Sequence, residues 1–113
     1  MKRHFTAKKR EQARMFVFAK LNYFNSFYKF KINRVAIKNT KTRWGSCSSK
    51  RNLNFNYKII YLRPDLAEYL IVHELCHLGQ LNHSKKFWDL VAKTMPNYVK
   101  INKELKKINV RLV

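Results

Sequence analysis

Acidic residues are scarce in this sequence: its 113 residues include 6 Asp and Glu but 25 Lys and Arg, a formal net charge of +19. A positive field of this size attracts polyanions, so the composition predicts non-specific contact with nucleic acid through a basic surface. A general bias toward lysine is the other explanation, but such a bias does not by itself remove the carboxylates.

Cysteine, glycine, proline and long apolar runs are also scarce. Cys47 and Cys76 are too few to form a disulfide framework, and 2 Gly and 2 Pro exclude collagen-like and low-complexity chains. No apolar run approaches the roughly 20 residues that a membrane-spanning helix needs, and no apolar segment follows the basic residues 1–10 as in a secretory signal. We therefore predict no membrane span and a reducing, cytoplasmic location.

The chain does contain enough apolar surface for one core. Hydrophobic residues make up 46% of the sequence and aromatic residues 14%, which argues against intrinsic disorder. No internal repeat and no linker rich in Ser, Gly or Pro divides the sequence. We predict a single domain that spans residues 1–113.

Helical periodicity marks the beginning of the chain. Between residues 8 and 30, apolar side chains recur at steps of three and four, as on the buried face of an amphipathic helix. The positions that carry this pattern are Ala13, Phe16, Val17, Phe24 and Phe27. We predict a long N-terminal helix that packs a broad face against the rest of the domain.

The middle of the chain has the period of two that is typical of β-strands. Apolar and polar residues alternate over residues 53–61, which predicts a half-buried strand. Residues 35–37 and 44–49 are shorter candidates, the second of them either a strand or a turn. Together these segments predict a short antiparallel or mixed sheet, so the predicted fold class is α+β.

A second helix follows the predicted sheet. Pro64 opens it, and Asp65 is favourable beside the positive end of the helix dipole. Residues 66–78 are apolar nearly all round the predicted helix, as in a helix buried on every side. Gly79 stands where a left-handed C-terminal cap is expected.

The last part of the chain predicts two more helical segments. Ser84 is the expected N-cap of the first, which has an apolar packing side. That side consists of Phe87, Trp88, Val91 and Met95. After an interruption at Pro96, a basic amphipathic segment over residues 98–109 closes the chain.

The predicted buried helix carries two histidines one turn apart. At about 100° per residue, His73 and His77 lie about 40° from each other on one stripe of the helix. Burying two imidazoles and the Glu74 carboxylate is costly unless something satisfies them, and a divalent metal does so. The pattern His73-Glu74-Leu75-Cys76-His77 is the HExxH arrangement of zinc hydrolases, in which the glutamate faces the water on the metal.

The third protein ligand expected at a catalytic zinc site is His83, six residues after His77. His83 directly precedes the expected N-cap Ser84, where the positive end of the helix dipole favours the neutral imidazole that binds metal. Three of the four histidines thus fall within an eleven-residue window. Three imidazoles with one open position suit Zn²⁺ best. The alternative is a set of hydrogen-bonded core histidines with a surface glutamate.

The remaining candidate ligands are predicted to lie outside the coordination of the metal. His4 is expected to be solvated near the start of the chain, and Cys76 faces about 100° away from the histidine stripe, toward the core. Cys47 is expected to be a bystander in a polar turn. Two roles are open for Asp89. Its carboxylate accepts a hydrogen bond from a metal-binding imidazole and so orients that ring, or, more commonly on so basic a chain, it pairs with a lysine.

One stretch of the chain resembles a known protein family. Residues 42–98 read TRWGSCSSKRNLNFNYKIIYLRPDLAEYLIVHELCHLGQLNHSKKFWDLVAKTMPNY. This segment looks like the YgjP-like metallopeptidase domain, also described as domain of unknown function 45, which is similar to the wider zincins of the SprT and WLM kind. Three separate features carry the resemblance: RWGSCS before the predicted strand, HELCH on the buried helix and NHSKKFW after it.

The resemblance implies a zincin-like domain, with a small sheet beside the HExxH helix and a substrate cleft along the edge of the sheet. It implies Zn²⁺ bound by His73, His77 and His83, with Glu74 as the catalytic base. The expected function is therefore zinc-dependent hydrolysis of peptide bonds in a peptide or protein substrate.

Substrate binding is expected to use the sheet. The edge of the strand over residues 53–61 offers backbone hydrogen bonds to an extended peptide. Besides zinc, Arg43, Tyr57 and Tyr98 are candidates, by chemistry alone, for stabilising the oxyanion, whereas Trp44 is expected to be a packing residue.

Two other hypotheses stay open at this point. The net charge of +19 favours a nucleic-acid-associated protein whose zinc is structural or vestigial, and salt-sensitive binding that survives loss of His73 would support it. The other hypothesis is a latent peptidase, in which the basic tail over residues 100–113 folds across the cleft and blocks it.

Overall fold

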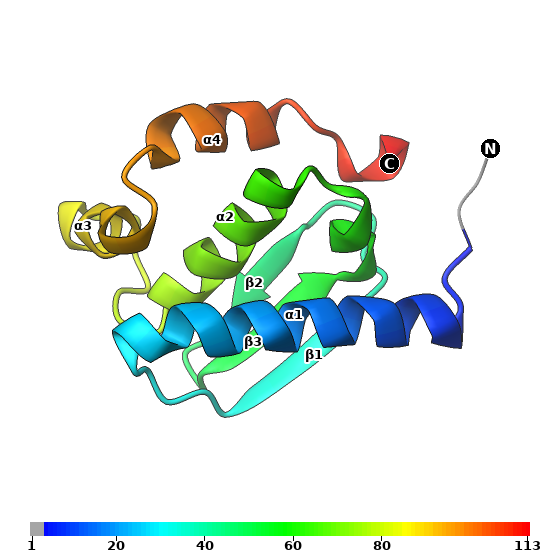
Figure 1. Cartoon of the computed structure of the whole chain (residues 1–113), viewed down its shortest axis with the longest axis horizontal. Coiled ribbons are helices and arrows are strands. Elements are labelled where there is room, and N and C mark those ends of the chain that lie inside the picture. Colours follow the sequence, from blue (N-terminus) through cyan, green and yellow to red (C-terminus); the bar gives the residue numbers. More distant parts are fainter. Residues whose placement is uncertain (1–3) are drawn as a thin grey trace.

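The computed structural model describes residues 4–113, which form helices around one face of a small sheet (Figure 1). Three strands alternate with the helices along the chain. The elements in order are α1 (Ala7–Tyr28), β1 (Arg34–Lys38), β2 (Gly45–Cys47), β3 (Asn52–Asn56), the 3₁₀ helix η1 (Tyr57–Tyr61), α2 (Pro64–Cys76), α3 (Lys85–Thr94), α4 (Tyr98–Lys106) and the 3₁₀ helix η2 (Val110–Leu112). The predicted α+β fold class is confirmed.

The sheet is mixed, with strand order β1-β3-β2. β1 runs parallel to β3, with Val35 opposite Leu53, and β2 runs antiparallel to β3, with Gly45 opposite Phe55. The central strand β3 therefore has partners on both sides, so the expectation that its edge is open to a substrate is wrong. The free edges belong to β1 and β2.

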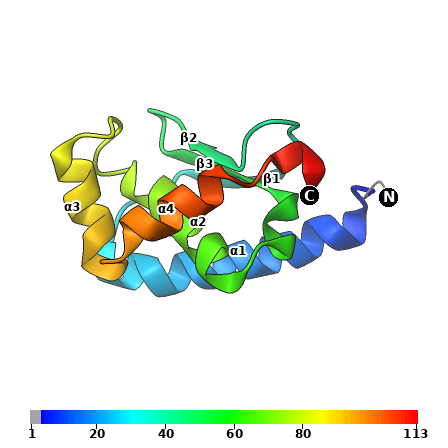
Figure 2. The same cartoon turned by 90° about the horizontal axis from the view of Figure 1, so that it is seen from above.

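Helix α2 lies at the centre of the molecule. It packs with α1 on one face of the sheet, and α3 and α4 lie on its other sides, as the two views in Figures 1 and 2 show. Leu66, Ile71 and Leu75 are at most 3% exposed. The prediction of a helix buried nearly all round is confirmed, and this burial places His73 and Glu74 between the core and a cleft.

Helix α1 matches its predicted range to within two residues. Thr6 caps its first turn by accepting a hydrogen bond from the Lys9 amide at 3.1 Å. The helix ends at Lys29, whose φ of 58° lies in the left-handed region. The buried stripe consists of Ala13, Val17, Leu21 and Phe24. Phe27, predicted as part of this stripe, is 61% exposed, so that part of the prediction is wrong.

The strand predicted over residues 53–61 ends at Asn56, and its second half is the 3₁₀ helix η1. The cause is the Asn56 side chain, which is 1% exposed and accepts a hydrogen bond from the Lys58 amide at 3.0 Å. Its amide group donates to the carbonyls of Thr40 (2.8 Å) and Arg43 (3.0 Å). This side chain thus caps η1 and fixes the loop before β2, and a pattern of alternating apolar residues cannot reveal either contact.

Gly79 is required for packing and not for its backbone conformation. No glycine in residues 4–113 has a positive φ, so the predicted left-handed cap is wrong. A Cβ at Gly79 would lie 2.8 Å from Cζ of Phe30 and 2.9 Å from Cδ1 of Leu90. The turn after α2 therefore passes against two side chains where only hydrogen fits.

The last helices bury the sides that their periodicity predicts. In α3, Phe87 and Val91 are buried and Trp88 is partly buried, the C-cap Met95 is buried, and Ile101 and Leu105 are buried in α4. Ser84 occupies the N-cap position of α3, but its side chain makes no capping hydrogen bond.

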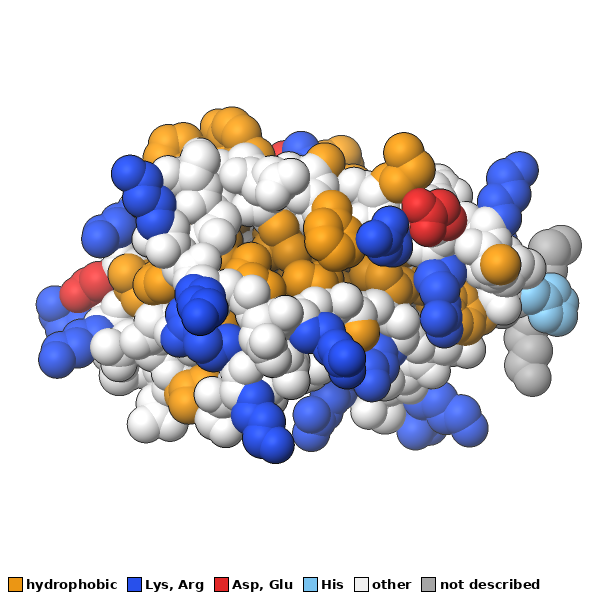
Figure 3. Space-filling model, turned by 90° about the horizontal axis from the view of Figure 1, so that it is seen from below, with side chains coloured by type: hydrophobic (Ala, Val, Ile, Leu, Met, Phe, Trp, Pro, Cys, Tyr) orange, Lys and Arg blue, Asp and Glu red, His pale blue; other side chains and the backbone are white. Residues whose placement is uncertain are grey.

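The surface carries the charge imbalance of the sequence. On the face seen in Figure 3, Lys and Arg side chains surround a band of exposed apolar groups. Five of the six acids form ion pairs, which are Glu11–Arg14, Glu68–Lys20, Asp65–Arg63, Glu104–Arg63 and Asp89–Lys85. Within residues 4–113, no helix combines the length and the hydropathy that a membrane crossing requires.

Replacing Asn56 by Ala is expected to lower the free energy of unfolding by about 2 kcal/mol, because two carbonyls and one amide of the backbone lose their partner. The matched control is Asn54→Ala on the same strand, whose side chain donates only to the Ser46 hydroxyl at 3.2 Å. This control should cost less than about 1 kcal/mol. Urea denaturation followed by circular dichroism measures both, and equal losses would contradict the capping role of Asn56.

Candidate active site

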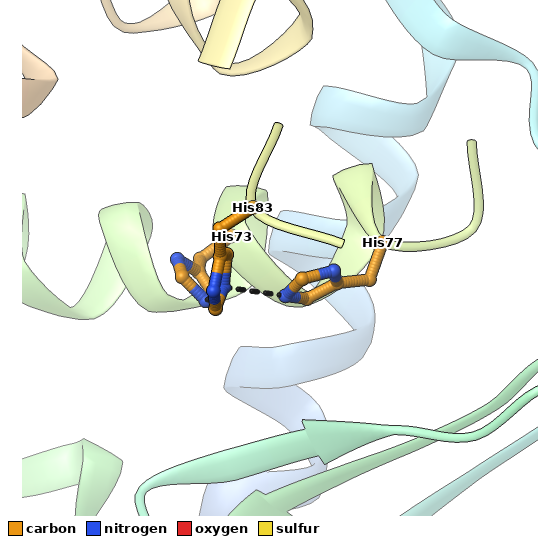
Figure 4. Close-up of side chains that lie close together, drawn as sticks. All are labelled: His73, His77 and His83. Atoms are coloured by element: carbon orange, nitrogen blue, oxygen red, sulfur yellow. Dashed lines mark hydrogen bonds between the residues drawn. The ribbon is translucent and has the colours of Figure 1, made fainter. Parts of the chain in front are cut away.

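Three histidine rings face one another at the C-terminal end of α2 (Figure 4). His73 lies in the last turn of α2, His77 follows one turn later as its C-cap, and the chain after Gly79 returns to bring His83 against them. The Nε2 atoms of His77 and His83 are 3.0 Å apart, and those of His83 and His73 are 3.2 Å apart. Within residues 4–113, these residues form the one group of three or more His, Cys, Asp or Glu side chains close enough to hold a metal ion.

The hydrogen on His77 is fixed by the backbone. Its Nδ1 atom lies 3.0 Å from the carbonyl oxygen of Gln80, which can only accept, so Nδ1 carries the hydrogen. The Nε2 atom of His77 therefore presents a lone pair to the other two rings. This is the tautomer in which an imidazole binds a metal through Nε2.

Burial keeps His73 and His77 neutral. Loss of solvent, together with the smaller effects of the neighbouring His77 and His83, lowers the pKa of His73 to about 3. Burial also lowers the pKa of His77. Both rings are therefore unprotonated at neutral pH, which is the state that a metal ligand requires.

A bound metal ion accounts for the positions of the three Nε2 atoms better than hydrogen bonds between the rings do. His83 Nε2 can carry one hydrogen, which serves only one of its two contacts with His73 and His77. A tetrahedral zinc ion with bonds of about 2.0–2.1 Å holds pairs of ligand nitrogens about 3.3 Å apart. The observed separations of 3.0 and 3.2 Å lie within a few tenths of an ångström of this value.

Aromatic side chains hold the three rings in place. Phe87 stacks on His77, with ring centroids 4.4 Å apart, and contacts His73 by its edge at 5.2 Å. Trp88 stacks on His83 at 5.7 Å. The predicted packing side of α3 is thus also the surface on which the histidines rest.

The Glu74 side chain extends from α2 to β2, where it lies against Gly45. Its side chain is 6% exposed, and burial raises its pKa to about 8, while the charge of Arg43 opposes this shift. A Cβ at Gly45 would lie 3.1 Å from Cγ and 3.2 Å from Oε2 of Glu74. Glycine at this position of β2 therefore makes room for the carboxyl group.

A cleft of about 260 Å³ opens beside Glu74 and His73. Residues from α2, from the segment that leads into β2 and from α4 form its walls. They are Arg43, Trp44, Gly45, Tyr69, Leu70, His73, Glu74, Asn102 and Leu105. The C-terminal segment, which the latency hypothesis places across the cleft, contributes Asn102 and Leu105 to one wall.

The free edge of β2 begins at this cleft, because Gly45, the first residue of β2, is part of its wall. In the antiparallel pair with β3, the Trp44 carbonyl accepts from the Asn56 amide at 2.8 Å, and the Ser48 amide donates to the Asn52 carbonyl at 3.0 Å. Backbone groups alternate in direction along such a strand. The N–H and C=O groups of Gly45 and Cys47 therefore point away from β3, toward the open edge.

The three candidates for oxyanion stabilisation lie in different places. Arg43 lines the cleft, and its charge acts on Glu74. Tyr57 is 1% exposed and belongs to the core, so it lies outside the cleft walls. Tyr98 stacks on Trp88 at 5.0 Å, behind the histidine cluster.

The side chains predicted to be bystanders lie outside the cluster. His4 is exposed, and Cys76 is fully buried in the core. Asp89 pairs with Lys85 at 3.3 Å, which confirms the second of its two interpretations. Cys47 lies on β2, where burial and the charge of Glu74 raise its pKa to about 11.

Two residues of the site are absent from the sequence predictions. The Tyr69 hydroxyl lies 3.2 Å from Nδ1 of His73, and the spacing of four residues on one helix would have revealed this contact. Asn102 comes from α4, 29 positions after His73, and no local pattern connects the two.

A family model, described as YgjP-like, metallopeptidase domain, matches residues 1–108 of the chain. The chain belongs to the YgjP-like metallopeptidase domain family. This match extends well beyond the segment 42–98 that carries the resemblance described above, and it includes α1, the three strands and the whole histidine cluster.

Solved structures share the fold of this YgjP-like domain. The crystal structure of the metallopeptidase zymogen abylysin of Pyrococcus abyssi superposes with a TM-score of 0.70 at 22% identity, over 81% of this chain and 94% of that one. The zymogen jannalysin of Methanocaldococcus jannaschii gives a TM-score of 0.68 at 23% identity, over 80% and 94%. A comparison with curated proteins finds no match.

The purified YgjP-like domain is expected to bind one zinc ion per chain, and His83→Ala should weaken this binding more than about 100-fold, since loss of a ligand exceeds the 10- to 100-fold effect of outer contacts. The matched control is His4→Ala, which removes the exposed histidine and should leave the affinity unchanged. Elemental analysis and competition with a chromophoric chelator measure stoichiometry and affinity. Equal affinities for the two variants would rule out His83 as a ligand.

Proposed function

We propose that this member of a metallopeptidase family is a zinc-dependent peptidase in which Glu74 is the general base. The observation that supports it is the convergence of three Nε2 atoms beside a buried carboxyl group in an open cleft. His73, His77 and His83 are the proposed zinc ligands. Three protein ligands leave one coordination position for water and substrate, as at catalytic zinc sites.

Bound zinc would supply a Lewis acid for the scissile carbonyl and lower the pKa of an attacking water to about 7. Glu74 is placed to take the proton from that water and to deliver it to the leaving amine. Its buried position supports both steps, because a carboxyl with a raised pKa exchanges a proton readily near neutral pH. A nearby divalent cation also favours the ionised form that starts the reaction.

An extended peptide is proposed to bind along the free edge of β2. Gly45 and Cys47 turn their backbone groups toward this edge, and the Glu74 carboxyl lies directly beside Gly45. Strand addition here carries the peptide past the catalytic carboxyl group. This assignment replaces the edge of residues 53–61, which is occupied in the sheet.

Arg43 is the proposed partner of the developing oxyanion besides zinc. It is the one cationic side chain among the residues that line the cleft. A guanidinium at this place stabilises negative charge that appears during attack on the carbonyl.

A structural or vestigial zinc is less well supported than a catalytic one. Structural zinc sites are closed by four protein ligands. Within residues 4–113, the cluster contains three, and it opens on a cleft.

The variant Glu74→Gln is expected to keep its zinc and to lower kcat by about 10²–10⁴-fold, because the amide cannot accept the proton of the attacking water. Glu68→Gln is the matched control, since Glu68 lies on the same helix but pairs with Lys20 at 2.7 Å. Hydrolysis of an unfolded protein by the zinc-loaded variants provides the readout. If Glu74→Gln cleaves as fast as the parent protein, Glu74 is not the base.

The β2 edge is tested by Cys47→Pro, which removes an outward N–H but leaves the bonds to β3 intact. The expected result is a rise in KM of about three- to tenfold for an extended peptide, the equivalent of one hydrogen bond. In the control Ser46→Pro, the missing N–H faces β3, so stability should fall instead. An unchanged KM in stable Cys47→Pro would exclude this edge from substrate binding.

A further inference from the structure

A buried tyrosine hydroxyl connects the histidine cluster to the C-terminal helix. Tyr69 is 1% exposed, and its Oη lies 3.2 Å from Nδ1 of His73. The same Oη lies 2.9 Å from Oδ1 of Asn102, in the middle of α4. Two elements from different parts of the chain therefore meet on one oxygen atom behind a metal-ligand candidate.

The direction of these two hydrogen bonds is determined by their chemistry. Oδ1 of Asn102 can only accept, so the Tyr69 hydroxyl donates its single hydrogen to Asn102. Burial raises the pKa of Tyr69, so this hydrogen is present at any physiological pH. Toward His73 the hydroxyl oxygen can then only accept, and Nδ1 of His73 must carry the hydrogen. Its Nε2 is left with a lone pair directed at His83.

We propose that Tyr69 and Asn102 are positioning residues of the metal centre: Asn102 orients the Tyr69 hydroxyl, and this hydroxyl selects the tautomer of His73 that binds metal through Nε2. The proposal rests on the zinc site of the proposed function. It makes α4 a part of that site, although α4 contributes no ligand.

The two ligands on α2 differ in how their tautomer is fixed. The Gln80 carbonyl fixes His77, and no side-chain substitution removes a backbone carbonyl. His73 depends on a side chain, and the orientation of that side chain depends on Asn102. Without an acceptor at position 102, the Tyr69 hydroxyl is free to rotate and donate to Nδ1 of His73. The hydrogen then moves to Nε2, which can no longer bind a metal.

This arrangement gives the C-terminal segment a role opposite to that of a latency device. A segment that blocks the cleft would increase activity when removed. A helix that fixes the tautomer of His73 instead lowers metal affinity when its contact is lost. Asn102 and Leu105, which form one wall of the cleft, then belong to a helix that supports the metal site.

The experiment compares the zinc affinities of four variants by competition with a chromophoric chelator, with circular dichroism to confirm the fold. Tyr69→Phe and Asn102→Leu should each weaken zinc binding by about 10- to 100-fold. Asn102→Asp keeps an acceptor and should bind at least as tightly as the parent protein. Tyr28→Phe is the matched control, because it removes a tyrosine hydroxyl that donates to the Leu90 carbonyl at 2.6 Å, outside the cluster.

The double variant Tyr69→Phe/Asn102→Leu separates positioning from simple packing. If Asn102 acts through the hydroxyl, the double variant loses no more affinity than Tyr69→Phe alone, whereas independent packing effects add. Additive losses, or an Asn102→Leu variant that binds zinc like the parent protein, would overturn the proposal. Absence of zinc binding by the parent protein would instead overturn the proposed function, and this inference with it.

Discussion

The site depends on the removal of water from one end of a helix. Helix α2 is surrounded by α1, the sheet, α3 and α4, so the polar groups at its end lose most of their hydration. Loss of hydration lowers the pKa of His73 and raises that of Glu74, which are the directions that metal binding and proton transfer need. One physical cause thus prepares both the proposed ligands and the carboxyl group.

The surrounding elements each contribute to the geometry of this buried end. Phe87 and Trp88 give the histidine rings flat apolar surfaces, and Gly45 gives Glu74 space beside β2. Asn56 fixes the loop that leads into β2, and so places the edge of the sheet at the cleft. The core and the site share residues of α3, since Phe87 is fully buried and also stacks on His77.

Local patterns in the sequence predict much of the fold and the histidine cluster, because helical periodicity and the HELCH spacing are set by neighbours along the chain. The strand predicted from the period of two is wrong after Asn56, where one buried side chain ends the strand and begins a 3₁₀ helix. The position of Gly79 after the predicted helix indicates a capping role, but the side chains that exclude a Cβ there come from α3 and the loop after α1. No local sequence pattern predicts the contact between Tyr69 and Asn102, because only tertiary packing brings α4 to α2.

The ion pairs that Asp and Glu form with Lys and Arg affect how a divalent cation reaches the histidine cluster. With five of six carboxylates already matched to lysine or arginine, Glu74 is the one acid in residues 4–113 without an ion pair. A free divalent cation therefore approaches against the repulsion of a strongly basic surface, toward a buried carboxyl group whose raised pKa keeps it largely neutral until the cation is near. Dissolved salt screens that repulsion over about 10 Å at 0.1 M, so the rate of loading rises with ionic strength even though the affinity is decided inside the fold.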